Sequence, residues 1–121
     1  MIGVLVLYLR VVKGYFQAMA STLERKFSLY WKSVKGPKLE AEFKFCESRR
    51  WRADFCHLAS KTLIELEGGL YINGRHSRGS AYEKDLEKYN EAEFLGYHLF
   101  RLGPNMITVP NLERIRDFLK G

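Results

Sequence analysis

The segment RWRADFCHLASKTLIELE, residues 50–67, contains the clearest structural signal in this chain. Two runs, Arg50–His57 and Lys61–Glu67, alternate between apolar and polar residues, and Ala59-Ser60 lies between them. Alternating runs of this length, separated by a short polar interval, are typical of two antiparallel strands joined by a tight turn. The segment therefore predicts a β-hairpin.

The alternation in this hairpin also predicts which side chains share a face, because successive side chains of a strand point to opposite sides of the sheet. The residues expected on the core face are Trp51, Ala53, Phe55, Ile64 and Leu66. The residues expected on the opposite, charged face are Arg50, Arg52, Asp54, Glu65 and Glu67.

The length of the turn predicts the register of the pairing. If Ala59-Ser60 forms a two-residue turn, residue 58 pairs with residue 61, and the pairing continued outward sets Asp54 opposite Glu65. Like charges in directly opposed positions are destabilising. With Glu67 on the same face, up to three carboxylates need neutralisation, and hard oxygen ligands favour Mg²⁺ or Mn²⁺ over zinc. The alternative is a solvated strand face on which these carboxylates pair with Arg50, Arg52 and Lys61.

Regular elements are expected on both sides of the hairpin. Ser21-Thr22-Leu23-Glu24 matches a capping box, and apolar residues then recur at helical spacing. The expected order is a helix over 22–34, strands over 39–45, 50–57 and 61–67, a glycine-rich loop to 81, a helix over 82–94, a strand over 95–102 and a helix over 110–119. This order, a helix, three strands, a helix, a strand and a helix, predicts an α+β (α/β) fold.

Composition is typical of one basic globular domain. Twenty basic and fourteen acidic residues give a net charge of +6 over 121 residues, which favours a polyanionic partner. We expect a single domain over 1–121, with an N-terminal arm or extra strand over 1–20, the core over 21–102 and a C-terminal helix over 110–120. Only two cysteines, Cys46 and Cys56, occur, so an intracellular, cytoplasmic location without disulfides is expected.

The apolar segment 2–12 is too short, and is interrupted too early by Arg10, to span a membrane. Its positive charges follow the apolar run, unlike those of a signal peptide. Its β-branched and aromatic content favours a strand, or an arm that binds a partner.

Several motifs together resemble the PD-(D/E)XK nuclease superfamily, which implies an αβββαβ core with a central mixed sheet flanked by helices. Within this superfamily, the chain looks most like small phage-encoded nucleases similar to archaeal-type Holliday junction resolvases. The stretches that carry the resemblance are Leu23-Glu24, Arg49 to Phe55, Ile64 to Gly69, Gly74 to Gly79, Tyr82 to Asp85 and Glu87 to Asn90.

The resemblance implies a magnesium site in which Mn²⁺ substitutes. Asp54 would be the bridging metal ligand, Glu65 the second carboxylate, the Leu66 carbonyl a backbone ligand, and Glu24 the residue that completes the acidic cluster. For Glu24 the competing interpretation is the capping box itself.

This chain departs from the family pattern at one position. The family has lysine two residues after the second carboxylate, where this sequence has Glu67. Glu67 would then act as general base or additional ligand, or else Lys84 or Lys88 of the following helix reaches the site. The alternative for both lysines is an exposed helix face.

The function that the resemblance implies is a Mg²⁺-dependent endodeoxyribonuclease selective for branched or duplex DNA, with the Holliday junction as first candidate. Hydrolysis by metal-activated water would leave 5′-phosphate ends. Cutting two strands symmetrically requires two sites, so a homodimer is expected. The residues expected to contact DNA are Arg50, Arg52, Arg75, His76, Arg78, Lys84 and Lys88. The alternatives are a nicking or restriction-type endonuclease of the same superfamily and a catalytically silent basic module that binds nucleic acid.

Overall fold

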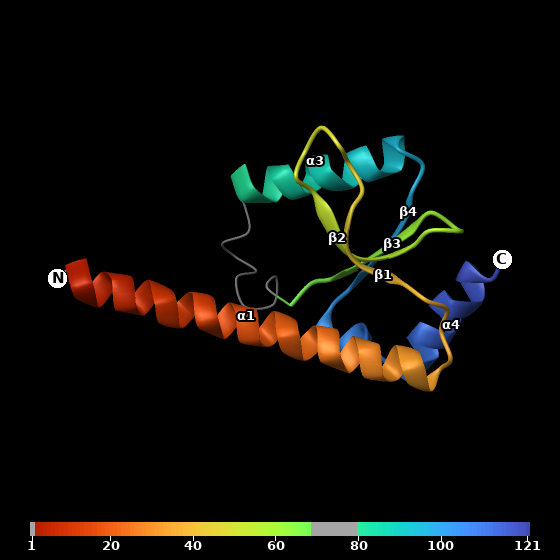
Figure 1. Cartoon of the computed structure of the whole chain (residues 1–121), viewed down its shortest axis with the longest axis horizontal. Helices are drawn as coiled ribbons and strands as arrows, with labels where there is room; N and C mark the ends of the chain where they lie inside the picture. Colours follow the sequence, from red (N-terminus) through yellow and green to blue (C-terminus); the bar gives the residue numbers. More distant parts are fainter. Residues whose placement is uncertain (1, 69–79) are drawn as a thin grey trace.

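The computed structural model describes residues 2–68 and 80–121, which form an α+β fold built around a four-stranded mixed sheet (Figure 1). In chain order the elements are α1 (Ile2–Ser33), β1 (Glu40–Lys44), β2 (Arg52–His57), β3 (Thr62–Leu66), α3 (Ser80–Phe94), β4 (His98–Leu102), a 3₁₀ turn η1 (Pro104–Met106) and α4 (Val109–Leu119). The predicted αβββαβ order with a C-terminal helix is confirmed.

The sheet has the strand order β1-β2-β3-β4. The first two pairings are antiparallel, and β3 pairs with β4 in parallel. Phe55 lies opposite Ile64, so the register continued by one residue sets Asp54 opposite Glu65. The register predicted from the two-residue turn is therefore correct.

Helices cover both faces of the sheet. Helices α1 and α4 lie on one side and α3 on the other (Figure 1). On the first side, Phe27, Ile64 and Leu112 belong to one buried cluster, and the Phe27 ring stacks on Phe55 at 4.8 Å between centroids. On the second side, Leu63 and Ala92 belong to another cluster.

This double coverage corrects the predicted division into one core face and one charged face. Phe55 packs in the cluster of α1 and α4, whereas Trp51 and Ala53 pack in the cluster of α3. The side chains of β2 therefore change sides of the sheet at Asp54, which lies opposite Glu42 in the register. The backbone of Glu42 adopts a left-handed φ of 47°. A non-glycine residue in this conformation departs from regular strand geometry, so period-two alternation does not continue through it.

The strand expected as one alternative for the N-terminal segment 2–12 is not formed, because these residues begin α1; the other alternative, an arm that binds a partner, stays a prediction. No proline interrupts the chain between residues 2 and 33, and an apolar run of this kind does not by itself distinguish strand from helix. The same continuous helix passes through Ser21, so the expected capping box does not begin a helix there.

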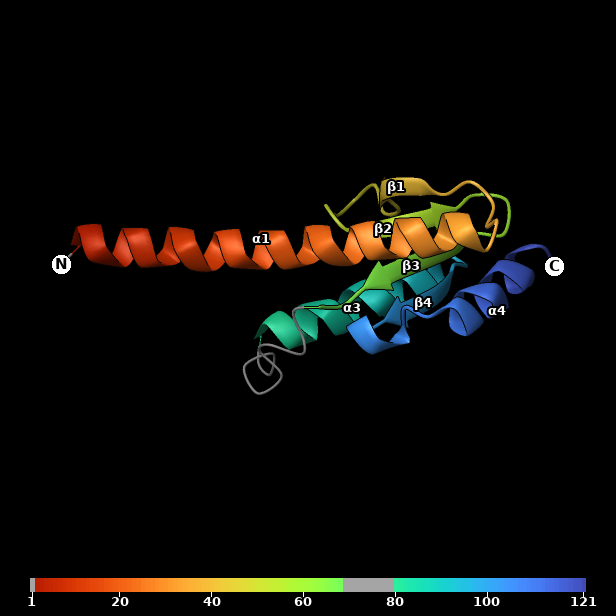
Figure 2. The same cartoon turned by 90° about the horizontal axis from the view of Figure 1, so that it is seen from below.

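The helix α1 reaches well past the sheet at its N-terminal end (Figure 2). Val4, Leu7 and Val11 are largely exposed, whereas Leu23 and Phe27 are buried against the sheet. Only the C-terminal part of α1 therefore contributes described side chains to the core.

Two smaller features complete the fold. The strand expected from residue 95 begins at His98, because Gly96, with a φ of +84°, ends α3 in a left-handed conformation. Cys46 and Cys56 are buried free thiols, as predicted. Within residues 2–68 and 80–121, none of the helices combines the length and the apolar character that a membrane crossing requires.

Candidate active site

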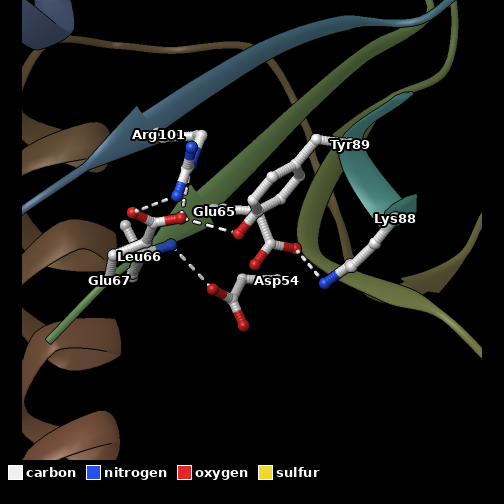
Figure 3. A network of polar contacts seen from close by, with 7 residues as sticks. All are labelled: Asp54, Glu65, Leu66, Glu67, Lys88, Tyr89 and Arg101. Carbon is white, nitrogen blue, oxygen red and sulfur yellow. Dashed lines mark hydrogen bonds and ion pairs between the residues drawn. The ribbon is translucent and has the colours of Figure 1, made fainter. Parts of the chain in front are cut away.

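Asp54 and Glu65 lie side by side on the two central strands, β2 and β3 (Figure 3). The Leu66 backbone N–H donates a hydrogen bond of 2.7 Å to Asp54 Oδ2, which fixes the carboxylate across the strand pair. Burial raises the pKa of Asp54 above its ordinary value, and the hydrogen bond from Leu66 and the charge of Lys88 oppose this rise. The site therefore begins with two carboxylates held close together by strand register.

Glu65 is the more deeply buried of the two carboxylates, with 9% of the residue exposed. Lys88 of α3 donates from Nζ to Glu65 Oε1 at 3.2 Å, and the lysine side chain is itself only 16% exposed. Burial raises the pKa of Glu65 to about 7, even though Lys88 acts in the opposite direction. A single lysine thus compensates only part of the charge on the Asp54–Glu65 pair.

Lys88 and Lys84 have different surroundings although they are one helical turn apart on α3. Lys88 points into the site (Figure 3), whereas Lys84 is exposed. The expectation that both lysines lie on an exposed helix face is wrong for Lys88. Of the two lysines, Lys88 is the one whose amine contacts an acidic residue of the site.

Glu67 is held in a separate polar network. Its Oε1 accepts hydrogen bonds from the Tyr89 hydroxyl at 2.7 Å and from Arg101 Nε at 2.5 Å, and its Oε2 accepts from Arg101 Nη2 at 3.0 Å (Figure 3). The Arg101 guanidinium also lies 4.0 Å from the centre of the Tyr89 ring. A carboxylate with both oxygens occupied in this way is suited to fixing the end of β3 rather than to accepting a proton from water.

Glu24 approaches the site from α1 without joining the two strand carboxylates directly. Burial raises its pKa, and the negative charges of Asp54 and Glu42 raise it further, which shows that Glu24 is within electrostatic range of Asp54. Across the described part of the chain, no three acidic, histidine or cysteine side chains converge closely enough to hold a metal ion by themselves.

The donor set nevertheless suits a hard divalent cation. Asp54 and Glu65 supply carboxylate oxygens, their raised pKa values reflect the cost of holding negative charge there, and a bound cation would relieve it. Mg²⁺ usually takes one or two carboxylates and keeps several waters. Two adjacent carboxylates, with Glu24 near by, therefore suit Mg²⁺, which does not require a complete cage of protein ligands.

The solvated-face alternative for these carboxylates does not hold. Glu65 is buried, and Lys61, one of its proposed partners, donates to the Leu95 carbonyl at 2.7 Å instead. Arg52 pairs with Glu42 at 3.9 Å rather than with Asp54. Arg50 and Arg52 are exposed. The predicted DNA contacts Arg75, His76 and Arg78 lie outside the described residues.

Sequence reasoning missed Tyr89 and Arg101 as the hydrogen-bond partners of Glu67. Arg101 interrupts an otherwise apolar stretch of β4 and lies next to Glu65 in the parallel register. An isolated cation in a strand is a usable signal, but only once the neighbouring strand is known. Comparison of the chain with protein families, with curated proteins and with solved structures finds no match.

The raised pKa of Glu65 leads to a testable prediction about stability. Because the ordinary value is 4.5 and the folded value is about 7, the folded state binds this proton more tightly than the unfolded state. The contribution of Glu65 to the free energy of unfolding is therefore fully present below about pH 4.5 and is lost as the pH rises through about 7. In metal-free buffer, the free energy of unfolding of Glu65→Gln should not show this decrease with pH.

Urea unfolding of the wild-type protein and of Glu65→Gln across this pH range measures the effect. The matched control is Glu113→Gln, since the Glu113 side chain is 47% exposed. Equal pH slopes for the wild-type protein and Glu65→Gln would contradict the prediction.

Proposed function

We propose that this protein is a Mg²⁺-dependent endonuclease of the PD-(D/E)XK type, which hydrolyses phosphodiester bonds in DNA and leaves 5′-phosphate ends. The observation that carries the proposal is the convergence of Asp54, Glu65 and Lys88 at the centre of the sheet. Two carboxylates and a lysine at one point of a mixed sheet supply the residue types that this chemistry needs, although the lysine comes from α3 instead of β3.

Each side chain has a distinct role in the proposed reaction. Asp54 and Glu65 hold the cation, which when bound neutralises charge on the scissile phosphate and favours ionisation of the attacking water. Lys88 fixes the orientation of Glu65 and presents a positive charge where the phosphate oxygens collect negative charge in the transition state. Arg101 and Tyr89 keep Glu67 in place at the end of β3.

The proposed substrate is branched DNA, with the four-way junction as the first candidate. The net charge of +6 favours a polyanion, and shape and backbone charge are the proposed basis of selectivity. Symmetric cleavage of two strands requires two sites, which a homodimer supplies. The exposed apolar side chains of α1 support such a dimer.

A panel of labelled substrates tests the proposal. The purified protein is incubated with Mg²⁺ and a synthetic four-way junction, a linear duplex or a single strand. We expect paired cuts in the junction. The 5′ ends of the products should accept a labelled phosphate only after a phosphatase has removed the phosphate that cleavage leaves there. Preference for the duplex would instead identify a nicking or restriction-type enzyme. Binding of every substrate without cleavage would identify a catalytically silent module.

The dimer gives a separate prediction about α1. Removal of residues 2–12 should leave a folded protein, because the described side chains that α1 contributes to the core begin at Leu23. The truncated chain should be monomeric and should nick junctions without the paired cut. Circular dichroism and light scattering measure folding and mass.

A matched variant keeps the helix and changes only its surface: Val4→Gln, Leu7→Gln and Val11→Gln combined should have the same effect on mass. An unfolded truncated chain, or an unchanged dimer in both variants, would contradict the proposed role of this segment.

A further inference from the structure

Three positively charged side chains line one hollow on the surface of β1 and β2. Lys44 lies on β1, Arg52 lies opposite it on β2, and Arg50 precedes Arg52 by two residues. The hollow has a volume of about 400 Å³, and the described residues that line it are these three cations. All three are exposed. A concave surface of this composition is suited to a small anionic group.

The charges in this hollow are largely uncompensated by the protein. Within the described part of the chain, neither Lys44 nor Arg50 has an ion-pair partner. Arg52 approaches Glu42 at 3.9 Å, but the two side chains are 62% and 73% exposed. Exposed pairs of this kind contribute little free energy, so the Arg52 guanidinium remains available to a ligand.

The hollow adjoins the candidate active site. Arg52 and Asp54 are two residues apart on β2, so their backbone positions lie at most about 7 Å apart. Glu42 lies next to both the hollow and the candidate active site, because it pairs with Arg52 and is opposite Asp54 in the register. This separation is similar to the spacing of neighbouring phosphates along one nucleic acid strand.

We propose that the hollow formed by Lys44, Arg50 and Arg52 binds the phosphodiester phosphate next to the one that is cleaved, on the same DNA strand. The inference rests on the proposed function and adds a defined contact to it. Arginine binds phosphate oxygens through its planar fork of N–H donors, and lysine adds a compact positive charge. The contact is to the backbone, so it orients the strand without reading the bases.

The test combines a protein variant with a modified substrate. The cleavage position is first mapped with the wild-type protein and Mg²⁺. Binding is then measured in EDTA, with substrates that carry one uncharged methylphosphonate linkage at successive positions around the cleavage site. In the wild-type protein, neutralising the neighbouring linkage should weaken binding about tenfold, as expected for one charge-assisted hydrogen-bonded contact.

The same loss is expected for Arg52→Ala on the unmodified substrate, and in Arg52→Ala the methylphosphonate at that linkage should cause no additional loss. Lys38→Ala is the matched control, because Lys38 is 87% exposed and lies outside the hollow. This control should bind more tightly than Arg52→Ala and retain the sensitivity at the neighbouring linkage.

Two results would overturn the inference in distinguishable ways. Suppose first that the wild-type protein cleaves DNA. The phosphate site is then wrong, and the proposed function stands, if Arg52→Ala binds DNA like Lys38→Ala. The same holds if the loss of binding from Arg52→Ala and the loss from the methylphosphonate add at every linkage. If the wild-type protein cleaves no DNA, whether or not it binds DNA, the proposed function fails and the phosphate site, which is defined by the cleaved phosphate, fails with it.

Discussion

Asp54→Asn is expected to slow DNA cleavage about a thousandfold or more, while DNA binding stays intact or becomes tighter. Asn keeps the shape of Asp and an oxygen that can accept the Leu66 N–H, so the local backbone is preserved. It removes the charge that holds the cation, which is worth several kcal/mol in the transition state, and each 1.36 kcal/mol corresponds to a tenfold change in rate. Removing one negative charge beside the DNA backbone favours binding.

Single-turnover cleavage and gel-shift affinity on one preparation of the variant measure both effects. The matched control is Asp117→Asn, which removes an exposed carboxylate from α4 and should leave cleavage unchanged. Thermal unfolding confirms that each variant is folded, and Asp54→Asn should be at least as stable as the wild-type protein because it no longer buries a carboxylate. Cleavage by Asp54→Asn at a rate near that of the wild-type protein would show that the site is assigned to the wrong residues.

Lys88→Ala is expected to slow cleavage about a hundredfold to a thousandfold at neutral pH, the range found when one preorganised donor is removed from an active site. A second effect is specific to its contact with Glu65. Lys88 lowers the pKa of Glu65 through its charge and its hydrogen bond, so its removal should raise that pKa. Because a proton on Glu65 competes with the cation, the pH dependence of cleavage at subsaturating Mg²⁺ should shift to higher pH, and part of the lost activity should return there.

Lys84→Ala provides the control for this prediction, since Lys84 lies one turn away on the same helix and is exposed. It should weaken DNA binding at most slightly and leave the pH profile of cleavage unchanged. A Lys88→Ala enzyme with the wild-type pH profile, or equal losses in the two variants, would contradict the assignment of Lys88.

The sequence allowed the central pairing of the site to be predicted because that pairing is local. Ala59-Ser60 fixes a short turn, and the turn fixes the register that sets Asp54 opposite Glu65. The identity of the lysine was not accessible in the same way. Lys84 and Lys88 have the same helical spacing, and only the docking of α3 on the sheet brings Lys88 within hydrogen-bond distance of Glu65.

The remaining differences also depend on contacts that are distant in sequence. Arg101 reaches Glu67 across the parallel pairing of β3 and β4, which no turn specifies. The sides on which Ala53 and Phe55 pack depend on the coverage of both faces of the sheet. Residues 2–12 are apolar except for Arg10, so their pattern carries too little periodicity to separate helix from strand.

Single-turnover cleavage of a synthetic four-way junction, measured as Mg²⁺ is added to protein first stripped of metal with EDTA, tests the central claim most directly. The account predicts no cleavage in EDTA, a rate that rises and saturates with Mg²⁺, and restoration by Mn²⁺. Cleavage at the same rate in EDTA, or no cleavage of any DNA at saturating Mg²⁺ by folded protein, would contradict it.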